Sequence, residues 1–158
     1  MKEQKRLNSE LIDLLQGEKV VSLITNDVKT GQPDLAMISW VVANSEGDRI
    51  NFAIGHNASS ASNIQNDPSV ILGVIGAGSC FSIKGKGEVS DIIEKTIKLR
   101  VVSVEIESVE DVMFYGGKVT TEPAYEKTYN KELAEKLDNE VYGVLRETLG
   151  QTSDIVSK

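Results

Sequence analysis

Apolar and polar positions alternate along much of the chain, in short runs typical of β-strands. The runs are rich in Val, Ile and Leu, and turn sequences such as residues 44–48 separate them. They cover residues 19–25, 35–43, 49–54, 69–75, 80–89 and 97–109. Because the connections between the early runs are short, consecutive strands are expected to pair antiparallel. The pattern therefore predicts a mainly β protein with six antiparallel strands.

Four other segments favour helix. A short helix is expected before Gly17, one or two turns before Pro68, a polar piece near residues 91–96, and a longer helix over residues 131–149. The expected N-caps are Asn8 or Ser9, then Ser59 or Ser60, and Asn130 for the last helix. An apolar stripe follows the i, i+4 spacing of the last helix and includes Leu133, Leu137 and Val141. This stripe needs a cover, which is either the chain's own barrel or a second subunit.

The length of 158 residues suits one domain and is short for two. Six strands of this spacing predict a barrel or a sandwich, and closing a barrel removes exposed strand edges. We expect a single domain over residues 1–150 and a frayed tail at residues 151–158. Residues 113–129 follow neither period, so an irregular connection is expected there.

Composition and charge argue against several classes of function. The net charge of −7 argues against nucleic acid or an anionic membrane as a partner, since both need clustered Lys and Arg. Cys80 is the only cysteine and His56 the only histidine, so neither an internal disulfide nor a metal site is expected. No apolar run follows the charged N-terminus, and we therefore expect a cytoplasmic protein without a signal peptide or membrane span.

Several short motifs occur in a recognisable order between Lys19 and Val89. They are Val21-Ser22-Leu23-Ile24-Thr25, Gly31-Gln32-Pro33, Ile38-Ser39-Trp40-Val41-Val42, Ile50-Asn51-Phe52-Ala53, Ala61-Ser62-Asn63-Ile64 with Asn66-Asp67-Pro68, and Lys84-Gly85-Lys86-Gly87-Glu88-Val89. In order and spacing this half of the chain resembles the pyridoxamine 5′-phosphate oxidase-like split barrels that bind FMN, a family with general stress protein-like members. The resemblance implies a six-stranded antiparallel split barrel flanked by an N-terminal and a C-terminal helix.

The resemblance also implies a homodimer with FMN in grooves between the subunits. Carried over by position, the cofactor-binding residues are Met37, Ile38, Ser39 and Trp40 for the ring, Gly55, His56, Ser59, Ser60 and Asn63 near the phosphate, and Lys84 and Lys86 from a neighbouring strand or the other subunit. The family's basic phosphate-binding pair is replaced by Ser59-Ser60. Losing two charged hydrogen bonds costs about 3–6 kcal/mol, or about two to four decades in affinity. Ser59 and Ser60 are either helix caps alone or phosphate contacts.

Two functions remain open from the sequence. The first is an FMN-dependent oxidoreductase that acts on a small organic substrate, with the redox chemistry left to the flavin. The second is a barrel that binds another planar ligand, such as a deazaflavin or haem, or that serves without catalysis as a binding or stress protein. No residue can be assigned as catalytic. Trp40 either stacks on the ligand or packs in the core or interface, and His56 either contacts the ligand or faces water in a loop.

A homodimer is expected for either function, because a split barrel leaves an apolar face exposed. The expected contributors are residues 80–89, the region of Trp40, and the stripe Leu133, Leu137 and Val141. The competing expectation is a monomer whose last helix covers its own barrel.

Overall fold

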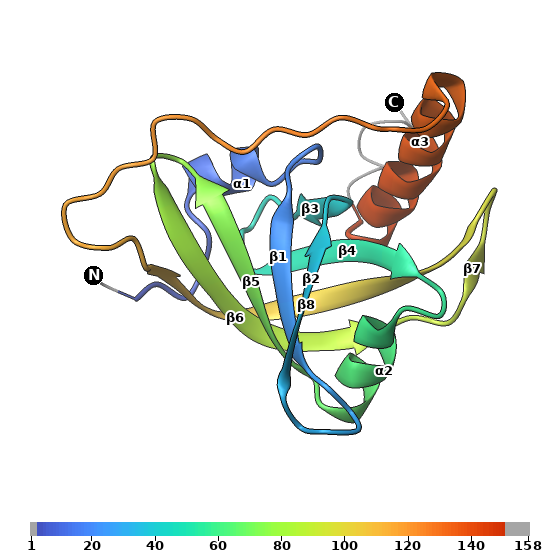
Figure 1. Ribbon diagram of the computed structural model, residues 1–158, viewed down its shortest axis with the longest axis horizontal. Coiled ribbons are helices and arrows are strands. Elements are labelled where there is room, and N and C mark those ends of the chain that lie inside the picture. Colours follow the sequence, from blue (N-terminus) through green and yellow to red (C-terminus); the bar gives the residue numbers. More distant parts are fainter. Residues whose placement is uncertain (1–2, 151–158) are drawn as a thin grey trace.

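The strands form one curled antiparallel sheet (Figure 1). The computed structural model describes residues 3–150, so the tail expected at 151–158 lies outside the described residues. The strands are β1 (Val21–Asn26), β2 (Pro33–Ile38), β3 (Val41–Ala43), β4 (Arg49–Gly55), β5 (Ser69–Gly76), β6 (Ser79–Val89), β7 (Ile93–Glu94) and β8 (Lys98–Asp111). Their order across the sheet is β2-β1-β5-β6-β8-β4-β3, and β7 pairs with β8. Because β2 and β3 occupy opposite ends of this order, the barrel is split between them, which confirms the predicted fold.

All six predicted strands are present, one of them divided into β2 and β3, and β7 is additional. The strand predicted at 35–43 is broken at Ser39 and Trp40, because β2 pairs with β1 whereas β3 pairs with β4 at the other end of the sheet. The helical piece predicted at 91–96 is wrong, since Ile93 and Glu94 pair with the start of β8. Ile93 packs against a buried apolar cluster from this position, and that contact favours the strand.

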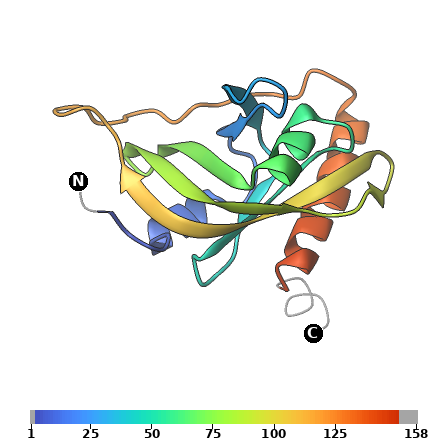
Figure 2. The same cartoon turned by 90° about the horizontal axis from the view of Figure 1, so that it is seen from below.

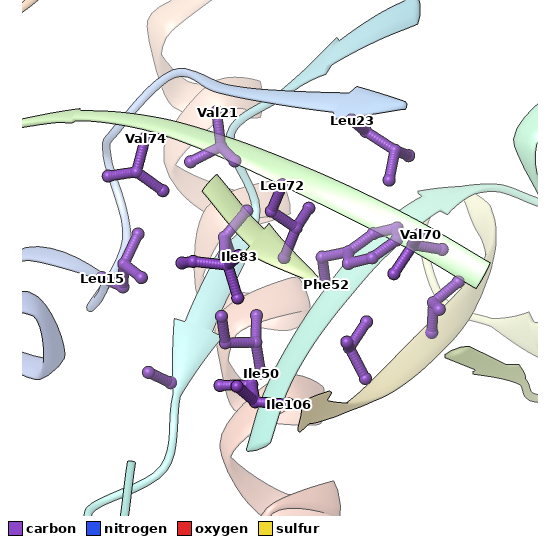
Figure 3. Close-up of a cluster of buried hydrophobic side chains, with 14 of the residues drawn as sticks. Leu15, Val21, Leu23, Ile50, Phe52, Val70, Leu72, Val74, Ile83 and Ile106 are labelled. Carbon is purple, nitrogen blue, oxygen red and sulfur yellow. The ribbon is translucent and has the colours of Figure 1, made fainter. Parts of the chain in front are cut away.

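Aliphatic side chains from alternate strand positions fill the interior of the barrel (Figure 3). Phe52 of β4 is the largest fully buried side chain. The labelled neighbours include Val21, Leu23, Ile50, Val70, Leu72, Val74, Ile83 and Ile106. Gly85 lies at a register shift of β6, where an added Cβ would come within 2.3 Å of the backbone oxygen of Glu105. Only glycine allows the two strands to approach this closely, so the register shift of β6 at this point depends on it.

Within residues 3–150, three helices flank the sheet: α1 (Ser9–Leu14), α2 (Ser59–Asn66) and α3 (Lys131–Thr148). The predicted caps Asn8 and Asn130 are confirmed, since their side chains accept hydrogen bonds from the first turns of α1 and α3. The predicted capping by Ser59 or Ser60 is wrong. The N-cap of α2 is Ala58, which has no side-chain acceptor, and both serines lie inside the first turn.

Helix α3 packs against the outer face of β3, β4 and β8 (Figure 2). Its buried residues Val141 and Leu145 contact a cluster with Val42 and Leu99. Leu133, expected on the same stripe, is exposed at the start of the helix. The chain's own barrel is therefore the cover for most of the stripe. None of the helices within residues 3–150 has the length and apolar character needed to cross a membrane.

Residues 112–130 connect β8 to α3 without regular structure, as predicted for most of this segment, and we call them the strap (Figure 1). Two ion pairs hold the strap to the rest of the chain. Glu122 lies 3.0 Å from Lys19, and Lys127 lies 2.7 Å from Asp138 of α3. The strap is thus tied to the segment before β1 through Glu122 and to α3 through Lys127.

Candidate functional site

A groove of about 510 Å³ lies between the end of β2, the end of β4, the start of α2 and the strap. We call it the strap groove. Its size falls in the range of about 300–1,000 Å³ typical of small-molecule sites. It exists because the chain leaves the sheet at Ser39 and Trp40 to move from β2 to β3, so that neighbouring backbone is not covered by another strand.

The backbone at this break is held by Tyr142, a half-buried residue of α3. The Tyr142 hydroxyl accepts a hydrogen bond from the Glu18 backbone N–H (2.9 Å) and donates one to the Ser39 carbonyl (3.2 Å). Burial raises the pKa of Tyr142 well above its usual range, so the hydroxyl stays protonated near neutral pH. Tyr142 therefore fixes the wall formed by Ser39 without itself lining the groove.

The strap forms the opposite wall, which includes Tyr125, Lys127 and Tyr129. Asp138 joins the two walls, since it accepts a hydrogen bond from the Trp40 indole N–H (2.9 Å) and pairs with Lys127. Burial alone would lower the pKa of Lys127, but the hydrogen bond and charge of Asp138 outweigh it and raise this pKa. Lys127 is therefore protonated and neutralised by its partner at neutral pH.

The structure brings together six of the residues predicted from the sequence. Met37, Ile38, Ser39, Trp40, Gly55 and Ser60 line the strap groove. Ser59 is exposed at the first position of α2 and does not line it. His56 follows β4 in a loop, where its backbone N–H donates to Lys98 and its carbonyl accepts from the Arg100 guanidinium. The hydrogen bonds that His56 forms with the described residues thus come from its backbone.

The other three predicted residues lie elsewhere. Asn63 is buried, and its amide donates to Thr25 and Asp34 and accepts from the Val28 N–H, so it fastens α2 to the β1–β2 hairpin. Lys84 and Lys86 are exposed on the outer side of β6, where the Lys86 ammonium donates to the Ser69 hydroxyl. The single chain therefore does not place these side chains in the groove.

The strap residues and Asp138 were not predicted from the sequence. A loop carries no periodic signal, and Asp138 is one of many charged residues on α3. The available signal was composition: aromatic residues are only 5% of the chain, yet Tyr125 and Tyr129 occur together in an irregular segment.

The groove opens onto an outer sheet face that no element of residues 3–150 covers. We call it the bare face, and its outward residues lie in register across four strands. Residues paired across β2, β1, β5 and β6 form rows on this face. The first row is Leu35, Ile24, Ile71 and Lys84, and the second is Met37, Ser22, Gly73 and Ser82. Ile75 and Cys80 form a further pair across β5 and β6. Leu35 and Met37 are 63% and 58% exposed. Because Met37 also lines the strap groove, whatever covers the bare face also borders the groove.

Comparison with known proteins gives a result from structure alone. No family model matches the sequence, and no curated protein matches it. A structure described as a pyridoxamine 5′-phosphate oxidase from Lactobacillus delbrueckii matches with a TM-score of 0.59 and 18% identity, covering 70% of this chain and 99% of that one. The chain has the split-barrel fold.

Two further structures share this fold. HupZ from Group A Streptococcus has a TM-score of 0.58 and 12% identity, with 72% of this chain and 98% of that chain covered. An F420 reductase has a TM-score of 0.52 and 15% identity, with 66% and 98% covered. The fold is thus that of the pyridoxamine 5′-phosphate oxidase-like proteins, as the resemblance predicted, while the function must be argued from the site.

The two parts of FMN fit the groove differently. The apolar and aromatic lining, with Ile38, Trp40 and Tyr129, suits a planar ring. The phosphate finds no free cation, because Lys127 is the only cationic side chain of the described residues in the lining and it is paired with Asp138. Within residues 3–150 there is also no cluster of three or more His, Cys, Asp or Glu that could hold a metal ion.

Proposed function

We propose that the protein binds the ring of FMN in the strap groove and acts in the cytoplasm as an FMN-dependent oxidoreductase on a small organic substrate. The observation that carries this proposal is the groove itself, a slot in the split of the barrel with strand backbone on one side and tyrosines on the other. A bound flavin supplies the redox chemistry, and the chain supplies binding, orientation and exclusion of water.

Individual residues have defined tasks in this proposal. The backbone from Met37 to Trp40 forms the surface on which the ring lies, and Tyr142 holds the Ser39 carbonyl in place. Tyr125 and Tyr129 cover the ring from the strap side. Such a site orients a planar ligand through shape and a small number of polar groups.

The proposed assembly is a homodimer formed through the bare face. The two rows of this face that begin at Leu35 and Met37 carry apolar or small side chains, apart from Lys84, which lies on β6 at the end of the first row. A contiguous apolar face of this kind is typical of an interface, and two-fold pairing is the commonest arrangement. Because Met37 belongs to both surfaces, the second copy would border the strap groove.

Titration of the purified protein with FMN, followed by flavin fluorescence, tests the ligand. We expect saturable binding, and no binding at about 100 μM FMN, equivalent to about −5.5 kcal/mol, would reject the proposal.

A groove-filling variant tests the location. A Cβ at Gly55 would meet no atom within 4 Å, so Gly55→Val is expected to fold and to narrow the groove, weakening FMN binding at least about tenfold. Gly143→Val on the exposed side of α3 also enters open space and is the matched control, for which no change is expected. Equal affinity of the Gly55→Val and Gly143→Val variants would place the ligand elsewhere.

The alternative is another planar ligand or a non-enzymatic role. Among the described residues, the groove lining has no free cation for a phosphate, which favours this alternative, and an F420 reductase shares the fold. Mass spectrometry of small molecules that co-purify with the protein separates the cases. A deazaflavin or haem would replace the FMN proposal, and a ligand-free protein that fails to bind flavin would favour a binding or stress protein.

A further inference from the structure

We propose that the strap groove recognises its ligand through the ring alone and does not recognise a phosphate, so that its ligand class is flavin-type ring compounds with or without a phosphate. This inference rests on the proposed function. It states which part of the flavin this chain binds, and therefore predicts that riboflavin and FMN bind about equally.

The charges in the groove carry the argument. Within residues 3–150 the only charged side chains in the lining are Glu126 and Lys127. Lys127 lies 2.7 Å from the Asp138 carboxylate, which Trp40 also holds by a hydrogen bond of 2.9 Å. To bind Lys127, a phosphate would have to displace the Asp138 carboxylate. Both side chains of this ion pair are more than three-quarters buried, and the Trp40 indole holds the carboxylate in place. The pair therefore leaves little attraction for a second anion.

The start of α2 is the other place where an anion could bind, because the first N–H groups of a helix are free. Ala58 and Ser60 from this turn line the groove. Neither has a positive charge, and the Ser60 side chain is buried. The helix dipole contributes at most a weak attraction that salt screens, so this turn does not replace a basic pair.

The basic residues Arg100, Lys84 and Lys86 do not supply the missing cation. Arg100 lies next to the end of β4, but its guanidinium donates to the carbonyls of His56 (3.0 Å) and Ser90 (2.9 Å) and does not line the groove. Lys84 and Lys86 point outward from β6. The net charge of −7 adds a general repulsion of anionic ligands.

The ring, in contrast, has several partners. Trp40, Tyr125 and Tyr129 give the groove three aromatic side chains, and Met37, Ile38 and Ile54 supply apolar contact. These surfaces come from β2, β4 and the strap, and Asp138 ties the strap to Trp40. Binding energy is therefore concentrated at the ring.

The first test compares riboflavin and FMN in parallel titrations of the full chain. We expect the two dissociation constants to agree within about fivefold, and the FMN affinity to stay constant or rise with salt, since screening reduces the repulsion by the net charge. A stronger preference for FMN, or an FMN affinity that falls with salt, would overturn the inference and leave the proposed function intact. A second copy that placed its Lys84 over the groove would give that result. Failure of both ligands to bind would reject the proposed function as well.

The second test adds the missing charge. Ser59 is exposed at the start of α2, and Ser59→Arg is expected to strengthen FMN binding at least about tenfold while leaving riboflavin unchanged. Ser62→Arg, exposed on the same helix but not next to the lining residues Ala58 and Ser60 as Ser59 is, is the matched control and should change neither affinity. Equal gains for both flavins, or no gain for FMN, would count against the inference.

Discussion

The two outer faces of the sheet have the same kind of residue in very different surroundings. The face of β3, β4 and β8 is covered by α3, and its residues Val42 and Leu99 are fully buried. On the bare face, Leu35 and Met37 of β2 are more than half exposed. One outer face of the sheet is therefore covered by α3, whereas no element of the described residues covers the other.

The difference indicates which face contributes to the stability of the fold and which face is available for binding. The covered face uses the stripe of α3 inside the monomer, so that stripe is no longer free for an interface. The bare face borders the strap groove through Met37. We infer that α3 stabilises the fold, whereas the bare face serves assembly and the completion of the groove.

The largest expected effect is on the covered face. Leu145→Ala removes a fully buried side chain between α3 and the sheet and should lower the free energy of unfolding by about 2–5 kcal/mol, measured by urea denaturation. Leu133→Ala, exposed on the same helix, is the control and should change it by less than about 0.5 kcal/mol. Similar losses in both variants would mean that α3 is not anchored through its inner stripe.

The second effect concerns the bare face and should appear in assembly rather than in folding. Leu35→Glu places a charge on the exposed row of β2 and should weaken dimerisation by at least about 100-fold, or about 2.7 kcal/mol. Light scattering after size exclusion should give twice the monomer mass of 17.2 kDa for the wild type and a value near the monomer mass for Leu35→Glu at low micromolar concentration. Leu133→Glu is the matched variant and should remain dimeric. A monomeric wild type would contradict the dimer itself.

Some elements of the fold could be predicted from the sequence, and others could not. The alternation of apolar residues predicted the six longer strands, and the α3 stripe and the caps Asn8 and Asn130 predicted the flanking helices, because each signal is local. The break of the predicted strand at Ser39 and Trp40 could not be predicted from such local signals. It arises because the chain exchanges β1 for β4 as its partner, which depends on the whole sheet.

The site shows the same limit. The resemblance to the split barrels predicted Met37, Ile38, Ser39 and Trp40 by position, and the structure places all four at the groove. The strap joins that groove from almost ninety positions further along the chain, as in the case of Tyr129. A contact between an irregular segment and a strand this distant leaves no periodic trace in the sequence.

Trp40 packs against the apolar cluster under α3 and also lines the strap groove, and its replacement should have an intermediate effect. Trp40→Phe keeps an aromatic ring but loses the indole hydrogen bond to Asp138, which should reduce the free energy of unfolding by about 1 kcal/mol. Because Trp40 is the only tryptophan, circular dichroism is the suitable probe. An unchanged stability would show that Lys127 alone holds Asp138 in place.

The smallest expected effect concerns the far anchor of the strap, and its pH dependence has a definite sign. A hydrogen bond from Lys19 lowers the pKa of Glu122 below its ordinary value of 4.5. The stabilisation from this carboxylate is therefore complete at neutral pH and is lost as the pH falls through the lowered pKa. We expect Glu122→Gln to increase hydrogen exchange of the strap near Glu122 at pH 7, whereas wild type and variant should converge once the pH is below that pKa. Glu147→Gln, near the end of α3 and outside the strap, should leave exchange in the strap unchanged at both pH values. A difference that persisted in acid would show that the side chain acts through packing and not through its charge.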